Sequence, residues 1–74
     1  GRYAWYWYRS GSPVSSKVLI ANGSSASWDP VRSGLCPDPR TEHVVIRLEA
    51  SIPIEGRSGV AEVPIHLACT PLPH

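Results

Sequence analysis

The side chains best able to hold a metal ion or form a covalent bridge are two cysteines and two histidines: Cys36, His43, His66 and Cys69. Such a set can supply a tetrahedral zinc site. However, zinc modules do not use the spacing between Cys36 and His43, and His66 alternates onto the opposite strand face from Cys69. An even pair of cysteines in a small chain favours a disulfide. We therefore predict a Cys36–Cys69 disulfide, two surface histidines, and no metal site or cofactor.

A catalytic site would need a nucleophile beside a base and an orienting acid. Ser58, in the sequence Gly-Arg-Ser-Gly, lacks the second intervening residue of a nucleophile elbow. Asp29 and Asp38 lie in expected loops, with nothing to fix them near a histidine. No phosphate-binding loop or carboxylate pair is present in the sequence, and a domain this small has little volume for a substrate pocket. We predict that the chain is not an enzyme.

Four consecutive aromatic residues, Trp-Tyr-Trp-Tyr, lie in a β-prone run between Arg2 and Arg9. Alternate side chains leave opposite faces of a strand, so core packing cannot absorb all four rings. Tyrosine keeps a hydroxyl in water while tryptophan gains more from burial, and we therefore expect Tyr6 and Tyr8 to be exposed. Exposed rings beside Arg2 and Arg9 could stack on a sugar or fill hot-spot pockets of a protein interface.

Two further arginines lie in constrained loops. Arg57 is in the expected turn of a long hairpin, and Arg40 follows the sequence Cys-Pro-Asp-Pro. Such loops can insert into a protease cleft, as inhibitors do, or dock on an acidic partner. The alternative is that arginine and glycine simply make soluble turns. The predicted binding residues are Arg2, Tyr6, Tyr8, Arg9, Arg40 and Arg57.

The element that must position these residues is a hairpin that extends from Val44 to Cys69. Apolar residues alternate with polar ones along both arms, which is the pattern of strands with one buried face. A turn centred on residues 56–59 pairs Leu48 with Leu67, and every apolar residue then meets an apolar residue. The same register predicts a loop from residue 55 to residue 60, an outer third of the hairpin that projects from the body, and His66 opposite Glu49.

We predict strands and loops for the rest of the chain. Val18, Leu19 and Ile20 form the centre of another strand, and Asn22-Gly23 is the best short hairpin signal in the sequence. Asn22-Gly23-Ser24 also spells an N-glycosylation acceptor, which matters only in a eukaryotic secretory host. Residues 24–40 are polar and punctuated by prolines, and they predict a long surface loop or a short irregular strand.

Composition restricts the class of protein. The 74 residues make one domain, and a chain of this length buries only about 60% of its unfolded surface, so a disulfide would add needed stability. The net charge of +1 comes from dispersed residues and argues against nucleic-acid binding. No apolar run is long enough to span a bilayer. The disulfide and a first residue other than methionine predict a processed protein from an oxidising compartment, secreted or at the cell surface.

One part of the chain resembles the middle of an immunoglobulin variable domain. The similar positions are Trp7-Tyr8-Arg9, Pro13, Lys17 to Ile20, Ser24-Ser25, Pro30, Arg32 and Ser33-Gly34. No cysteine precedes the tryptophan, and Cys69 lacks the Asp-x-Ala-x-Tyr sequence that leads to the second cysteine of that family. The resemblance implies recognition through loops rather than catalysis, and it assigns no site residue.

Together these patterns predict an all-β antiparallel domain of about five strands, a small sandwich or partly open barrel over residues 1–74. The leading hypothesis is a secreted or cell-surface binding module that engages a protein partner, in an inhibitor-like manner or otherwise. Its contacts would be the aromatic strand and the hairpin tip at Arg57. The alternatives are a carbohydrate-binding module that uses the exposed rings, or a coat- or adhesin-type subunit. That subunit would form homo-oligomers through the same strand or hairpin.

Overall fold

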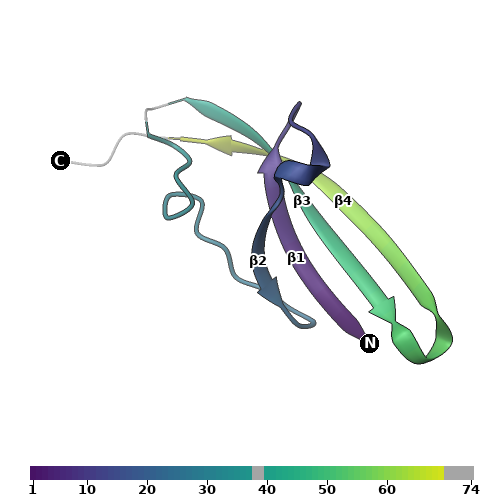
Figure 1. The fold of residues 1–74 in the computed structure, drawn as a ribbon. Helices are drawn as coiled ribbons and strands as arrows, with labels where there is room; N and C mark the ends of the chain where they lie inside the picture. Colours follow the sequence, from purple (N-terminus) through teal and green to yellow (C-terminus); the bar gives the residue numbers. More distant parts are fainter. Residues whose placement is uncertain (38–39, 70–74) are drawn as a thin grey trace.

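The computed structural model describes residues 1–37 and 40–69, which form four strands and two short 3₁₀ helices (Figure 1). The strands are β1 Arg2–Arg9, β2 Val18–Asn22, β3 Thr41–Ile52 and β4 Arg57–Ala68, and the helices are η1 Val14–Ser16 and η2 Pro53–Glu55. All strand pairs are antiparallel, and the strands lie side by side in the order β2-β1-β3-β4 in one open sheet. The predicted all-β antiparallel class is therefore confirmed.

The molecule is long and thin, with extents of 53 × 24 × 15 Å. Its radius of gyration is 14.4 Å, whereas a compact chain of this length would have roughly 11 Å. The amino terminus lies beside the tip of the β3–β4 hairpin, and the predicted Cys36–Cys69 disulfide is present at the other end (Figure 1). No helix in residues 1–37 or 40–69 has the length and apolar character needed to cross a membrane.

The sheet has an apolar face and a polar face because its strands alternate residue types with a period of two. On the apolar face, Trp7 of β1 pairs with Ile46 of β3, which pairs with Val63 of β4. On the polar face, Tyr6 pairs with Arg47. The aromatic run is thus divided as predicted, with its tryptophans on the apolar side and its tyrosines on the opposite side.

The most buried part of the molecule is at the disulfide end of the apolar face, where residues 24–37 lie against the sheet. Trp28 packs on Trp7 with ring centroids 5.7 Å apart. Leu35 and Val44 are each only 1% exposed. Toward the hairpin tip the same face is open, and Ile52 is 43% exposed. The covering segment therefore protects one end of the sheet and leaves the other end accessible.

The register of β3 and β4 differs from the predicted one by six residues. Leu48 pairs with Ala61, and the prediction that it pairs with Leu67 is wrong. A shift by an even number of residues keeps every side chain on its face, so the alternation of residue types could not reject it. Charge selects the observed register, since Arg47 lies opposite Glu62 with Nη1 and Oε2 2.8 Å apart.

The observed hairpin turn also lies earlier in the chain than predicted. It comprises η2 and Gly56, which has a φ of 65°, so the predicted loop over residues 55–60 is wrong. Proline in the first helical turn and glycine in a left-handed conformation both favour this turn. β1 runs beside β3 from Val44 to Ser51. The predicted projection of the outer third is therefore wrong, because only the turn extends beyond β1.

Asn22-Gly23 does not form the predicted hairpin turn. β2 ends at Asn22, and the following segment adds no strand to the sheet within the described residues. Gly23 donates its N–H to the Tyr3 carbonyl, and the Trp5 indole N–H donates to the Gly23 carbonyl at 2.8 Å. These two bonds fix Gly23 against β1, so the chain leaves the sheet as a loop, as predicted for residues 24–40 up to Pro37.

Candidate functional site

The predicted binding residues do not form one surface, because they lie in three different regions of the sheet. Arg9 and Arg40 lie at the disulfide end, Tyr6 and Tyr8 lie on the polar face, and Arg2 and Arg57 lie near the hairpin tip. Asp38, considered as a catalytic acid, lies outside the described residues. Each of the three regions has to be judged on its own contacts.

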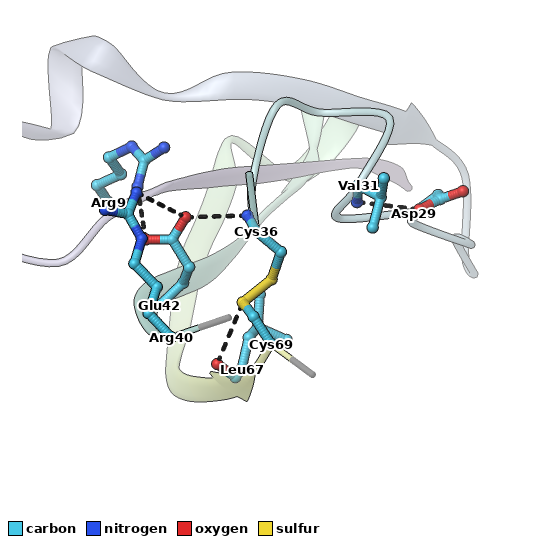
Figure 2. Close-up of a disulfide and its surroundings, with 8 residues drawn as sticks. All are labelled: Arg9, Asp29, Val31, Cys36, Arg40, Glu42, Leu67 and Cys69. Carbon is cyan, nitrogen blue, oxygen red and sulfur yellow. Dashed lines mark hydrogen bonds and ion pairs between the residues drawn. A yellow bond between two sulfur atoms is a disulfide. The ribbon is translucent and has the colours of Figure 1, made fainter. Parts of the chain in front are cut away.

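At the disulfide end, the buried carboxylate of Glu42 binds the two arginines predicted to be free (Figure 2). Glu42 Oε1 lies 3.1 Å from Arg9 Nη1 and 3.5 Å from Arg40 Nε, and its Oε2 accepts the Cys36 N–H at 3.0 Å. That backbone hydrogen bond lowers the pKa of Glu42 below its ordinary value, against the effect of burial, and the charges of Arg40 and Arg9 lower it further. Glu42 therefore links the disulfide loop, through the Cys36 N–H, and β1, through Arg9, to β3.

On the polar face, charged side chains of β3 and β4 form a continuous network with Lys17, which precedes β2. Arg47 lies 2.8 Å from both Glu49 and Glu62, and Lys17 Nζ lies 3.4 Å from Glu49. Hydrogen bonds from Arg47 lower the pKa of Glu49, and hydrogen bonds from Tyr8 and Arg47 lower that of Glu62. The charges in this network already satisfy one another, so it offers little unpaired charge to a ligand.

The two tyrosines belong to this network rather than to an open surface. Tyr8 is only 7% exposed, so the expectation that it is an exposed ring is wrong. Its hydroxyl donates to Glu62 at 2.7 Å, and this bond, together with burial, raises the pKa of Tyr8. Tyr6 is half-buried, with Lys17 Nζ 5.0 Å above its ring. A buried ring and a ring capped by lysine leave no flat aromatic platform here.

The hairpin-tip end is different, because exposed apolar side chains and arginines occur there together. We call this region the tip surface: Arg2, Tyr3, Ile52, Ile54, Arg57 and Val60. Ile54 in the turn is 99% exposed, and Ile52 beside it is 43% exposed. Arg57 makes only a 3.7 Å contact with Glu55, and Arg2 has no ion pair within the described ranges. Within the described ranges, the tip surface is the one predicted region that combines an unpaired arginine, Arg2, with exposed apolar area.

Two of the hollows that border the tip surface are lined in part by small residues of β3 and β4. One of about 140 Å³ is lined by Tyr3, Ile52 and Arg57 over a floor that includes Gly59. The other, of about 390 Å³, opens on the polar face between Arg2 and Val60. The smaller hollow suits a single side chain, whereas the larger reaches the size of a small-ligand pocket. Asn22, the predicted glycosylation position, is exposed and lines the larger hollow.

One close pair of functional side chains was missed by sequence reasoning. His66 lies opposite His43, not opposite Glu49 as predicted, and the two ring centroids are 4.6 Å apart. His66 was placed opposite the wrong residue because the predicted register of β3 and β4 was wrong by six residues. The Arg47–Glu62 charge match was the signal in the sequence that would have aligned the strands and brought the histidines together.

The chain matches no protein-family model, no curated protein and no solved structure.

Proposed function

We propose that the chain is a secreted or cell-surface, non-enzymatic binding module that engages a protein partner through the tip surface. The observation that carries the proposal is the exposure of Ile54, at 99%, in a turn of fixed conformation that leads directly to Arg57. Contiguous exposed apolar residues mark interaction sites on soluble chains, and arginine and tyrosine are enriched among interface hot spots. The disulfide is compatible with an extracellular setting.

A protein partner fits this surface better than a sugar does. Sugar binding relies on flat, accessible rings, but the rings of Trp5, Trp7 and Tyr6 are half-buried and that of Tyr8 is buried. Tyr3 is the one ring of the tip surface, and it is 41% exposed. The other apolar members are branched aliphatic residues, which fill pockets rather than stack on sugar faces.

The charge of the tip surface indicates the chemistry of the partner. Arg2 and Arg57 are the two residues of the tip surface that are charged at neutral pH, and both are cations. The exposed Glu55 nearby lies 3.7 Å from Arg57. An acidic segment with one apolar side chain would meet Arg57 and place that side chain in the hollow that Arg57 and Tyr3 line. The expected ligand is therefore an acidic, partly apolar protein segment.

The proposal is tested by selecting a phage-displayed random-peptide library against the intact, oxidised chain. Selected peptides should be enriched in Asp or Glu with an apolar residue, and should lose at least about tenfold in affinity for Ile54→Asp and for Arg57→Ala, as hot-spot losses do. Val31→Asp is the matched control, because Val31 is exposed but lies outside the tip surface. Peptides that bind Ile54→Asp as well as the parent chain would contradict the proposal.

Two further experiments on the same oxidised chain distinguish this proposal from a carbohydrate-binding module and from an assembly subunit. Binding to a glycan array that is retained by Ile54→Asp would favour a carbohydrate-binding module. Concentration-dependent self-association in sedimentation, abolished by Ile54→Asp, would favour an assembly subunit. We expect a monomer that binds no glycan.

A further inference from the structure

His43 and His66 form an exposed pair at the end of the sheet opposite the tip surface. They are direct cross-strand partners on the polar face, with ring centroids 4.6 Å apart and ring planes at 75°. No hydrogen bond or ion pair engages either imidazole in the part of the chain that the structure describes. Two accessible imidazoles without other partners, held at a fixed separation, are ligands available to a metal ion.

The ring separation agrees with joint coordination of one ion. Zinc binds imidazole nitrogen at about 2.0–2.1 Å with tetrahedral angles, which puts the centroids of two rings on the same ion roughly 5 Å apart. The observed distance of 4.6 Å is close to that value. The two rings are therefore at a separation that one shared ion can accommodate.

The surroundings favour a cation. The flanking pairs on the same face are Thr41 with Ala68 and Val45 with Pro64, all of them uncharged. The nearest arginines, at positions 9 and 40, point to Glu42, which belongs to the apolar face. The imidazoles are therefore not confronted by a like charge that would oppose metal binding.

The backbone beneath the pair is fixed at both strands. The Cys36–Cys69 disulfide joins the chain three residues beyond His66, and the Cys69 N–H donates to the Arg40 carbonyl at 2.8 Å. The His43 carbonyl accepts the Ser10 N–H at 3.0 Å. This clamping holds the two ligands at their separation before any ion arrives, which reduces the entropic cost of chelation.

We propose that His43 and His66 form a two-histidine site for a divalent transition-metal ion, with Zn²⁺ as the ion that fits its geometry. No group of three or more His, Cys, Asp or Glu side chains is placed to hold a metal in residues 1–37 and 40–69, so the site supplies two ligands. The remaining two positions of the ion take water or donor groups of a bound molecule. The site is separate from the tip surface and does not depend on the protein-binding proposal.

The test is calorimetric titration with ZnCl₂ of the oxidised parent chain and of three variants, His43→Gln, His66→Gln and His74→Gln. We expect one zinc per chain, with affinity reduced at least about tenfold by loss of either ligand, since even groups behind a ligand are worth about 10–100-fold. His74→Gln is the matched control and should bind as the parent does. Circular dichroism confirms that each variant keeps the sheet.

A melting experiment gives an independent readout. An ion that bridges β3 and β4 binds only the folded chain, so saturating zinc should raise the melting temperature of the parent and of His74→Gln, and EDTA should reverse the rise. Neither His43→Gln nor His66→Gln should respond. No heat of binding at 1 mM zinc, equal affinity in both ligand variants, or loss of binding in His74→Gln would each overturn the proposal.

Discussion

At the scale of single residues, Glu42 links more separate segments of the chain than any other polar side chain described above. Its carboxylate accepts from the Cys36 backbone and pairs with arginines that come from β1 and from the start of β3. A buried carboxylate is tolerated only when its charge and lone pairs are satisfied, and here three donors do so. Cys36 itself has a φ of 60°, an uncommon conformation that the disulfide and this hydrogen bond hold in place.

The lowered pKa of Glu42 makes a prediction for acid stability. Its folded pKa lies below the ordinary 4.5, so the unfolded chain takes up the proton first, and stability that is present above that pH is lost as the pH falls through the folded pKa. Glu42→Gln cannot titrate. The difference in urea midpoint between parent and variant should therefore be large at about pH 7 and shrink by at least about half at about pH 3. An equal difference at both pH values would contradict this role.

At the scale of elements, the alternation of residue types predicted the two arms of the hairpin, and β-prone composition predicted β1 and β2 among about five expected strands. Neither pattern gave the alignment of β3 with β4. Strand membership depends on local pattern, which is visible in one sequence. Alignment depends on which pairs form across the hairpin, and the pattern of Val44 to Ile54 matches its partner equally well after an even shift. The site shows the same difference. The exposed tip was predicted through Arg57, whereas Arg2 was predicted beside exposed rings. Tyr8 is buried and bonded to Glu62, which is distant in the sequence, so no local pattern could predict it.

The observed turn predicts how its glycine responds to substitution. Gly56 has a φ of 65°, so Gly56→Ala should destabilise the chain by about 1–2 kcal/mol, the cost of a left-handed conformation for a residue with a Cβ. Gly56→Asn should cost less, because asparagine tolerates this region better. Gly59→Ala is the control, since Gly59 lies in β4 without a positive φ and has open space around it. Equal effects at the two glycines, measured by urea unfolding, would place the turn elsewhere.

At the scale of the whole molecule, the sheet is too thin for its stability to come from a large core. Tyr8, Leu35 and Val44 are the apolar residues classed as buried in the described ranges, and all three lie toward the disulfide end. A single sheet 15 Å thick cannot enclose many side chains. A domain of this length has a total stability of about 4–11 kcal/mol, so one covalent bridge can account for a large share of it.

We therefore expect loss of the disulfide to have a large effect on the stability of the folded chain. Cys36 and Cys69 are 33 residues apart, and closing a loop of that length stabilises the folded state by about 4 kcal/mol on the chain-entropy model. The double variant Cys36→Ser with Cys69→Ser should lose about that amount in urea unfolding at neutral pH, and reduction of the parent chain should have the same effect. Leu35→Ala is a useful comparison, because it removes packing at the same end and should cost about 2–5 kcal/mol with the bridge intact. If the double variant keeps the parent's urea midpoint, the packing of residues 24–37 against the sheet, rather than the bridge, holds this end of the molecule together.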